Sequence, residues 1–225
     1  MFGAWQAGAW RALASRVQPD LIVGASVGSV NGYIIASGAS PDELIELWRR
    51  PDFGALDRLL ENLDKLMEHY RLRTAYAVVL TDALRLKPRI FEGAQITARH
   101  LAASCAIPMV LPPYKIEGRW YNDGGLLNPL PVWAAVDLGA THIVALHALP
   151  EIPLGWLKPF AQGFRWAFGH NPPLPPSVEL TMYKPERTLG TMHSALYWER
   201  ENIERWIDLG YADASRAHVE SLDSL

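Results

Sequence analysis

The feature that most constrains this chain is a short apolar strand that runs directly into an apolar helix. Residues 21–23, Leu-Ile-Val, form a continuous apolar run after Pro19, which is typical of a strand covered on both faces. A helix is predicted to follow at once, from Val27 to about Ser37. A strand that is buried on both faces needs a helical layer on each side, so this segment favours an α/β architecture.

The same alternation of strands and helices continues along the chain. Ser40 is followed by Pro41 and by Glu43, which together form the signature of a helix start with a capping box. Glu117 and Gly118 separate two short strands and predict a tight hairpin. These patterns predict an α/β fold around a mostly parallel central sheet. The other helices are predicted over residues 4–16, 40–50, 53–70, 97–106, 131–138 and 191–218, and the other strands over residues 75–80, 89–91, 114–116, 119–121, 142–147 and 178–182.

Length and composition limit the classes of protein that this chain can belong to. Its 225 residues predict one domain, residues 1–225, and 49% hydrophobic with 20% charged residues is typical of a globular protein. A net charge of −3 leaves no cationic surface for nucleic acid, so we expect no nucleic-acid partner. Residues 21–41 carry no charge but are too rich in glycine and serine for a membrane span, and no signal peptide is recognisable. We therefore expect a cytoplasmic protein with at most transient contact with a membrane surface.

Cysteine use points away from disulfides and metal sites. The chain has a single cysteine, Cys105, which cannot form an internal disulfide and has no metal-ligand companion. We expect Cys105 to be a small buried apolar residue. No metal and no cofactor are expected.

Residues 24–28, Gly-Ala-Ser-Val-Gly, form a G-x-S-x-G motif at the predicted turn between strand and helix. A serine hydroxyl attacks only when a sharp turn makes its Oγ project, and Gly24 and Gly28 would let strand and helix approach closely. The helix that begins at Val27 directs unpaired amides to the same point, so the Val27 N–H can stabilise an oxyanion. Ser26 is thus a candidate nucleophile, although a βα turn without chemistry, or one that binds an anion, has the same pattern.

A second candidate group stands at the end of the predicted hairpin, where Asn122 precedes Asp123, Gly124 and Gly125. Taken alone, an Asp-Gly pair is typical of a turn. Beside Ser26, however, Asp123 could take the serine proton directly, and the two glycines would let its backbone approach the nucleophile. An ordinary carboxylate has a pKa of about 4 and is a weak base, so such a pair needs desolvation and an oxyanion hole.

In their order along the chain, these segments resemble the patatin-like phospholipase family. The resemblance covers most of residues 1–150 and implies a three-layer α/β/α fold. It also implies a Ser-Asp dyad that hydrolyses acyl esters of lipids through an acyl-enzyme, with Ser26 as the nucleophile and Asp123 as the general base. The implied partner is a lipid or acyl ester substrate. The segments that carry the resemblance are residues 24–32, 103–108, 120–125, 128–132 and 138–145.

The chain departs from the family pattern at its N-terminus. The family has a Gly-Gly-Gly-x-Arg/Lys-Gly loop whose amides complete the oxyanion hole, and here Gly3 begins a stretch that matches only its tail. Met1 stands at the variable position and Phe2 stands where a basic residue is usual. We hypothesise that the functional protein extends upstream by a strand that ends in three glycines; an in-frame stop codon directly before Met1 would exclude this.

Two other functions stay open at this level. A chain that lacks most of the glycine loop could be a catalytically weak or inactive lipid-binding protein of the same fold. A Ser-His-Asp α/β-hydrolase is the second alternative, because histidines follow Asp123 in the expected order. Against it, that fold has several strands and helices before its nucleophile, whereas Ser26 follows a single predicted helix. The candidate histidines for such a triad are His142, His147, His193 and His218.

Residues 149–176 differ from the rest of the chain. They hold seven of the 17 prolines, together with aromatic side chains at a helical spacing. The segment is either an irregular connection whose aromatic side chains join the core, or a lid that lies over an apolar pocket or a lipid surface.

Overall fold

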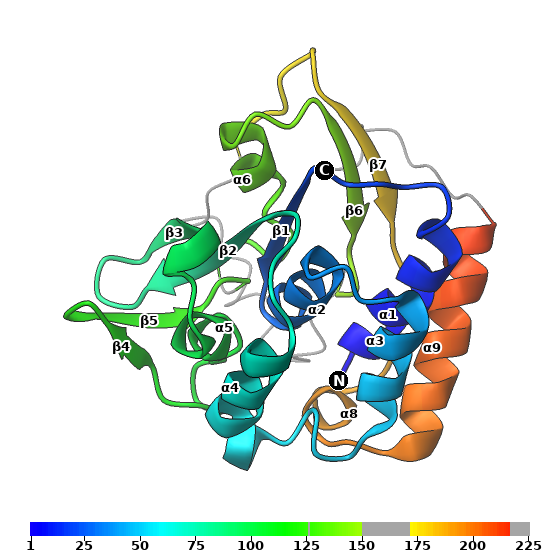
Figure 1. Cartoon of the computed structure of the whole chain (residues 1–225), viewed down its shortest axis with the longest axis horizontal. Coiled ribbons are helices and arrows are strands. Elements are labelled where there is room, and N and C mark those ends of the chain that lie inside the picture. The colour runs from blue at the N-terminus through cyan, green and yellow to red at the C-terminus, as the bar shows by residue number, and fades with distance from the viewer. Residues whose placement is uncertain (126, 150–171, 217–225) are drawn as a thin grey trace.

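This computed structural model describes residues 1–125, 127–149 and 172–216. In these residues, helices pack around two β-sheets (Figure 1). The larger sheet has the strand order β1-β2-β5-β4, with β3 also paired to β2, and the smaller sheet pairs β6 with β7. The strands are β1 (Leu21–Ala25), β2 (Ala75–Asp82), β3 (Lys87–Glu92), β4 (Tyr114–Ile116), β5 (Arg119–Asp123), β6 (His142–Leu146) and β7 (Glu179–Tyr183). The α-helices are α1 (Gly3–Leu13), α2 (Val27–Ala36), α3 (Pro41–Arg49), α4 (Leu59–His69), α5 (Ala98–Ser104), α6 (Val132–Asp137), α8 (Met192–Leu196) and α9 (Arg200–Ser215).

The larger sheet is mixed, so the prediction of a mostly parallel sheet is wrong. Strand β1 runs parallel to β2, whereas the β2–β3, β2–β5 and β4–β5 pairs are antiparallel. Short connections explain the β2–β3 and β4–β5 pairs, because a parallel pair needs a crossover of about a dozen residues or more. Only Glu117 and Gly118 join β4 to β5, and both have positive φ, at 50° and 80°, as a two-residue hairpin turn of the I′ type requires.

Strand β2 lies in the middle of three layers, which confirms the α/β/α prediction. All of its residues except the first are buried. Tyr76 and Val78 belong to the main core, which includes residues of α2 and α5. Val79, whose side chain points to the opposite face, packs in a second cluster with Trp133 and Ala134 of α6. Helices therefore cover both faces of the strand.

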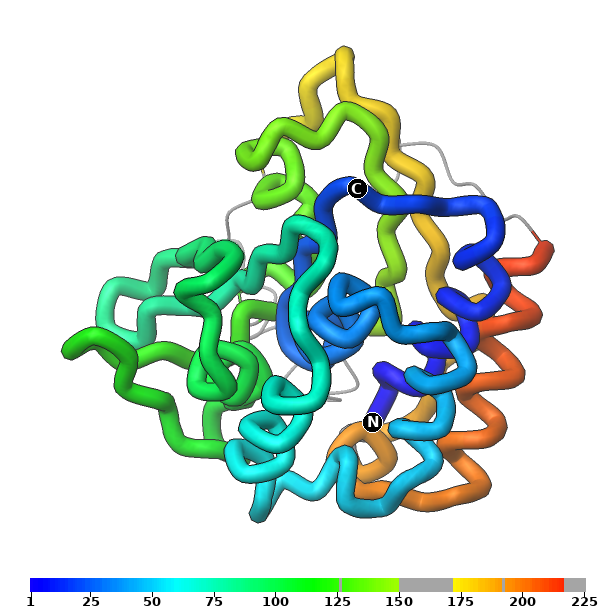
Figure 2. Tube along the Cα trace, viewed as in Figure 1, coloured from blue at the N-terminus to red at the C-terminus, as the bar shows by residue number. Residues whose placement is uncertain are grey.

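The first and last described helices, α1 and α9, lie side by side along one flank of the molecule (Figures 1 and 2). Their backbones touch at two glycines: a Cβ at Gly8 would lie 1.9 Å from the Ile207 carbonyl oxygen, and one at Gly210 would lie 1.9 Å from the Trp5 carbonyl oxygen. The buried Trp5 indole also donates a hydrogen bond to Asp213 Oδ2 at 2.8 Å. Only glycine at these two positions permits so close an approach.

Most helices and strands begin and end within three residues of the predicted bounds. Two helices differ more from the prediction. The helix predicted over residues 53–70 begins only at Leu59, after a 3₁₀ turn over Leu56–Arg58. The helix predicted over residues 191–218 is interrupted between α8 and α9, where the backbone is extended at Tyr197 and Glu199. At this break the Trp198 indole donates a hydrogen bond to the Trp48 carbonyl oxygen at 3.0 Å, so a tertiary contact replaces helix continuity. Residues 217–218 lie outside the described residues.

The capping box predicted at residue 40 is confirmed. The Ser40 hydroxyl accepts a hydrogen bond from the Glu43 N–H at 3.2 Å, and the Glu43 carboxylate accepts one from the Ser40 N–H at 2.7 Å. Pro41 occupies the first helical position, where its missing N–H has no cost.

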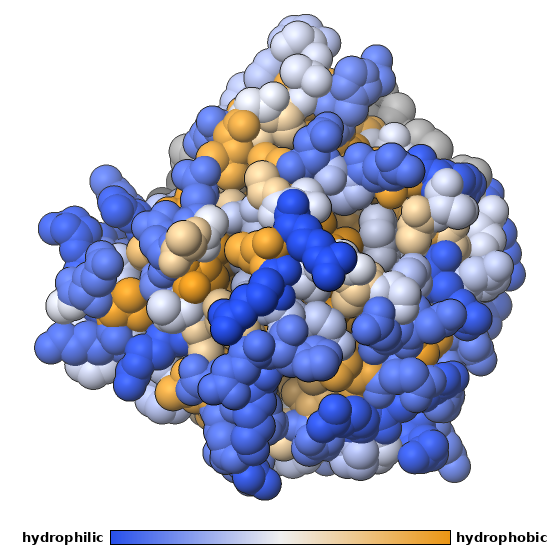
Figure 3. All heavy atoms as spheres, in the orientation of Figure 1, coloured by the Kyte–Doolittle hydropathy of each residue, from blue (hydrophilic) through white to orange (hydrophobic). Residues whose placement is uncertain are grey.

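The face of the molecule in Figure 3 is mostly hydrophilic, with smaller apolar areas between the polar side chains. In the described part of the chain, no helix combines the length and the apolar character that crossing a bilayer requires.

Candidate active site

The site forms where two strands meet end to end on one edge of β2. Strand β3 occupies one edge of β2, so β1 and β5 must share the other. Ala25, the last residue of β1, is opposite Val79, and Asp123, the last residue of β5, is opposite Leu80. Because β1 and β5 run in opposite directions, their carboxyl ends converge, and Ser26 emerges beside Asp123.

The two candidate side chains are in direct contact. The Ser26 hydroxyl donates a hydrogen bond to Asp123 Oδ2 at 2.6 Å, a length typical of a bond from a hydroxyl to a carboxylate. The other carboxylate oxygen, Oδ1, accepts a hydrogen bond from the Gly125 N–H at 2.6 Å. Asp123 is buried, whereas Ser26 is partly exposed. One oxygen is therefore anchored by an amide while the other faces the serine.

Ser26 is the single residue between β1 and α2, and its backbone is strained. Its φ of 52° and ψ of −137° are unusual for any residue other than glycine, at a cost of about 1–3 kcal/mol. The Ser26 carbonyl oxygen accepts hydrogen bonds from the Ser29 N–H at 2.9 Å and from the Ser29 hydroxyl at 2.6 Å. The turn is thus the sharp strand-to-helix elbow that the motif predicts.

Of the two motif glycines, only Gly24 is required by close packing. A Cβ at Gly24 would lie 2.5 Å from Ser29 Cα and 2.6 Å from the Gly28 carbonyl oxygen. At Gly28 the nearest atom to such a Cβ is Gln6 Nε2, at 3.4 Å, which is ordinary contact. The expectation that Gly28 also supplies room is wrong, because a Cβ at Gly28 would meet only the Gln6 side chain.

The glycines after Asp123 have different tasks. A Cβ at Gly124 would lie 1.9 Å from the Val79 carbonyl oxygen, so the loop passes directly against β2. A Cβ at Gly125 would lie 3.1 Å from Asp123 Oδ1 and 3.9 Å from Ser26 Cβ. Gly125 instead contributes its N–H to the carboxylate.

The start of α2 supplies amide groups beside the serine. Among the hydrogen bonds of the described residues, none uses the Val27 N–H, which begins the helix. The Ser26 N–H is occupied, because it donates to the Ser104 hydroxyl oxygen at 2.9 Å. Gly3 packs against Val27, where a Cβ would lie 2.5 Å from Val27 Cγ2, and its carbonyl oxygen accepts a hydrogen bond from the Asn31 amide at 2.9 Å.

Two residues that bond to the site were missed by the sequence interpretation. Ser104 contacts Ser26 as described, and the Thr81 hydroxyl donates to the Asp123 carbonyl oxygen at 2.9 Å. Ser104 stands in residues 103–108, a segment that carries the family resemblance, so a signal was present. Thr81 carried none, because it reads as one more residue of a buried strand.

None of the described histidines lies between Ser26 and Asp123, as a Ser-His-Asp triad would require. Since the Ser26 hydroxyl bonds to Asp123 directly, no imidazole stands between them. His142 is exposed, with Nε2 3.5 Å from Glu179 Oε2, and the His193 ring lies 4.5 Å from that of Tyr197. His147, another candidate for the triad, directly follows β6, and its N–H donates a hydrogen bond to the Tyr183 carbonyl oxygen. His218 and most of the predicted lid, residues 150–171, lie outside the described residues.

Cys105 follows Ser104 and is only partly buried, so the expectation of a buried residue holds in part. Desolvation, with a smaller contribution from the charge of Asp123, raises the pKa of its thiol to about 12. In the described ranges there is no group of three or more His, Cys, Asp or Glu side chains that could hold a metal ion.

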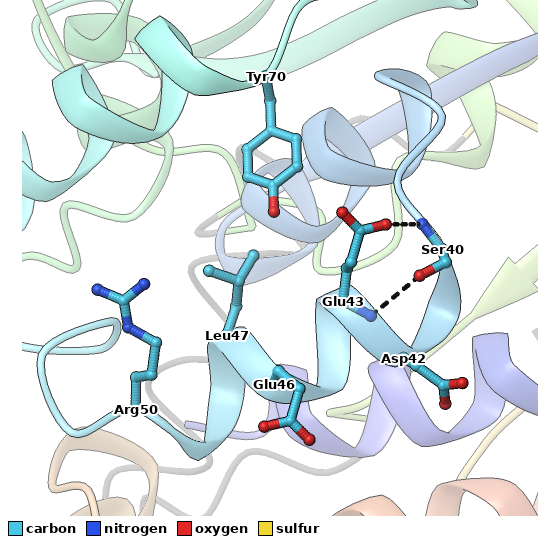
Figure 4. Close-up of a pocket in the computed structure, with 7 residues that line it drawn as sticks. All are labelled: Ser40, Asp42, Glu43, Glu46, Leu47, Arg50 and Tyr70. Atoms are coloured by element: carbon cyan, nitrogen blue, oxygen red, sulfur yellow. Dashed lines mark hydrogen bonds between the residues drawn. The ribbon is translucent and has the colours of Figure 1, made fainter.

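A hollow of about 380 Å³ lies elsewhere, over α3 and the end of α4 (Figure 4). Two of its polar residues, Ser40 and Glu43, bond to each other in the capping box. The Tyr70 hydroxyl points into the same hollow (Figure 4). Neither Ser26 nor Asp123 lines it, so this hollow adds no chemistry to the site.

The fold and the site define the class of this protein: an α/β protein with a nucleophile elbow and a serine bonded to an aspartate. The sequence model of the patatin-like phospholipase family matches residues 1–98 and 71–136, which is more than half of the chain. The chain belongs to the patatin-like phospholipase family, whose members are typically serine acyl hydrolases.

Individual relatives agree with this assignment. The chain is 30% identical, over 167 residues, to the uncharacterized NTE family proteins Mb1092c of Mycobacterium bovis and Rv1063c of Mycobacterium tuberculosis, with 61% of this chain and 46% of theirs covered. It thus spans about half the length of these relatives. The crystal structure of VipD from Legionella pneumophila is similar in fold, with a TM-score of 0.53 and 14% identity over 96% of this chain and 64% of that one.

Proposed function

We propose that the protein is a lipid acyl ester hydrolase in which Ser26 is the nucleophile and Asp123 the general base. The observation that carries the proposal is the 2.6 Å hydrogen bond from the Ser26 hydroxyl to Asp123 Oδ2. A general base must lie within about 2.6–3.2 Å of the proton that it removes, and this pair meets that condition before any substrate binds. Membership of the patatin-like phospholipase family supports an acyl ester of a lipid as the substrate class.

In the first half-reaction Ser26 Oγ attacks the carbonyl carbon of the ester, and its proton passes to Asp123 Oδ2. The carbonyl oxygen becomes an oxyanion, which the N–H of Val27 at the positive end of α2 can stabilise. When the tetrahedral intermediate collapses, the bond to the alcohol oxygen breaks and that oxygen takes the proton from Asp123. The alcohol leaves, and the acyl group stays on Ser26 as an ester.

The second half-reaction releases the acid. Asp123 takes a proton from water, whose oxygen attacks the acyl carbon, and the second intermediate expels Ser26 Oγ, which recovers the proton. The Gly125 N–H holds the carboxylate through Oδ1 in both halves, so Oδ2 keeps its direction toward the serine.

The test is hydrolysis of p-nitrophenyl butyrate and of phosphatidylcholine vesicles by the purified chain. Ser26→Ala and Asp123→Asn should each reduce turnover by about 1000-fold or more, as expected for groups that act as one unit. Ser15→Ala and Asp137→Asn replace an exposed serine and an exposed aspartate away from the site and should change turnover little. Full activity of Ser26→Ala would exclude the proposal.

The same assay separates the alternatives. His142→Ala, His147→Ala, His193→Ala and His218→Ala variants should retain activity, whereas loss in one of them together with Asp123→Asn would favour a Ser-His-Asp triad. Saturable binding of lipid vesicles without turnover by the unaltered chain would favour the inactive lipid-binding protein.

A further inference from the structure

Ser104, the last residue of α5, joins three segments of the site that are distant in the chain. Its side chain is fully buried, and its hydroxyl donates a hydrogen bond to the Val79 carbonyl oxygen of β2 at 3.0 Å. The same hydroxyl oxygen accepts the bond from the Ser26 N–H at 2.9 Å. Through its main chain, the Ser104 carbonyl oxygen accepts a bond from the Gly124 N–H at 3.3 Å.

A hydroxyl is the group that these contacts need. It has one proton to donate and lone pairs to accept, so it can serve Val79 and Ser26 at the same time. Alanine would leave the Ser26 N–H and the Val79 carbonyl oxygen without this partner in a water-excluded place. The segment after Ser104 adds a parallel contact, since the Ala106 carbonyl oxygen accepts a bond from the Asp123 N–H at 3.0 Å.

The bond to the Ser26 N–H acts on the strained part of the elbow. Ser26 has a φ of 52°, and rotation about its N–Cα bond would turn the Oγ away from Asp123. A partner fixed to the Ser26 N–H opposes that rotation. Because Ser104 itself is bonded to β2, the elbow is held against the same strand on which β5 ends.

We propose that Ser104 is a positioning residue for the reaction, which fixes the Ser26 elbow through its hydroxyl and the Asp123 loop through its carbonyl oxygen. The proposal rests on the proposed function. Ser104 makes no contact with the reacting atoms, because its hydroxyl faces the backbone of Ser26 and Val79. It also engages the Ser26 N–H, which leaves the Val27 N–H as the amide available to an oxyanion.

The test compares Ser104→Ala with Ser37→Ala, which is a matched control. Ser37 is also a buried serine, and its hydroxyl donates to the Ile34 carbonyl oxygen at 2.6 Å. It caps the far end of α2, about 15 Å along the helix from Ser26. Both variants lose a buried hydroxyl, so they should lose similar amounts of stability in urea, and only Ser104→Ala should lose catalysis.

For Ser104→Ala we expect kcat for p-nitrophenyl butyrate, per folded molecule, to fall by about 10- to 100-fold with KM within about threefold, because small displacements of a reacting group have effects of this size. Ser104→Thr keeps the hydroxyl and adds a methyl group to a filled space. It should lose stability but keep kcat, per folded molecule, well above that of Ser104→Ala. If Ser104→Thr does not fold, the Ala variants decide the question alone.

A kcat of Ser104→Ala within about twofold of the unaltered chain, while Ser26→Ala is inactive, would overturn the positioning role and leave the proposed function in place. Equal losses of kcat in Ser104→Ala and Ser37→Ala would also overturn it. Activity that survives in Ser26→Ala would instead remove the proposed function itself.

Discussion

Ser26 and Asp123, 97 residues apart in the chain, meet at 2.6 Å because β1 and β5 end at neighbouring residues of β2. Backbone pairing therefore sets the distance between the two side chains. Val79 and Leu80, which face the last residues of β1 and β5, are consecutive, so any shift of either strand along β2 would separate the pair.

Replacing Gly124 should disturb the site through the backbone. In Gly124→Ala the new Cβ would lie 1.9 Å from the Val79 carbonyl oxygen, which cannot move without breaking the pairing of β2. We expect a loss of about 1–3 kcal/mol in the free energy of unfolding, as for other overpacked sites, and a loss of esterase activity beyond the unfolded fraction. Urea unfolding and p-nitrophenyl ester hydrolysis measure the two effects.

Gly28→Ala is the matched control for stability. Its Cβ would meet nothing nearer than the Gln6 side chain at 3.4 Å, and alanine is the better helix former by up to about 1 kcal/mol. The unfolding free energy should therefore stay the same or rise. A loss as large as that in Gly124→Ala would contradict the packing described here.

The contact between α1 and α9 should depend on one buried hydrogen bond. Trp5→Phe removes the indole N–H that reaches Asp213 Oδ2 at 2.8 Å and leaves that oxygen buried without this donor. We expect a loss of about 1–3 kcal/mol in the free energy of unfolding. Trp10→Phe, on the same helix but only partly buried, should lose less, and equal losses would show that the bond to Asp213 contributes nothing.

Stability should fall with pH below about 6.5 because of His100. Desolvation, opposed in part by the charge of Glu117, lowers the pKa of this imidazole in the folded chain from 6.5. As the pH falls below 6.5 the unfolded chain binds the proton first, so the free energy of unfolding decreases until the pH passes the lowered pKa. The contacts agree, since neutral Nδ1 accepts a hydrogen bond from the Thr97 N–H at 3.1 Å.

Urea unfolding between pH 8 and pH 5 tests the role of His100. The unaltered chain should lose more stability below pH 6.5 than His100→Gln does. Carboxylates contribute to both proteins equally, so the difference between the two curves reports the histidine. Parallel curves would show that the imidazole titrates alike in the folded and unfolded chain.

Much of this fold was predictable because its signals are local. The capping box at Ser40 and the hairpin turn at Glu117 depend on residues that are neighbours in the chain, and the structure has both. The break between α8 and α9 was not predictable, since it depends on a contact between Trp198 and Trp48, 150 residues apart. Sheet direction failed for a related reason, because apolar runs show that strands exist but not which edges pair.

The site, like the fold, was predictable only where its signals are local. Its two motifs are local, and the family resemblance implied that they meet. How they meet was not predictable, because it depends on the register of β1 and β5 on β2, which brings the ends of these two strands together. The need for glycine at position 24 and the freedom at position 28 likewise depend on the path of α2 past β1.

The most direct measurement of the central claim is labelling of the purified chain with a fluorophosphonate, followed by peptide mapping. If Asp123 activates Ser26, the phosphonyl group should be found on Ser26, labelling should be absent in Ser26→Ala, and it should be slower by about 100-fold or more in Asp123→Asn. Cys105 should stay unmodified, because its thiol pKa of about 12 leaves almost no thiolate at pH 8. Labelling at another residue, or at an equal rate in Asp123→Asn, would contradict the account.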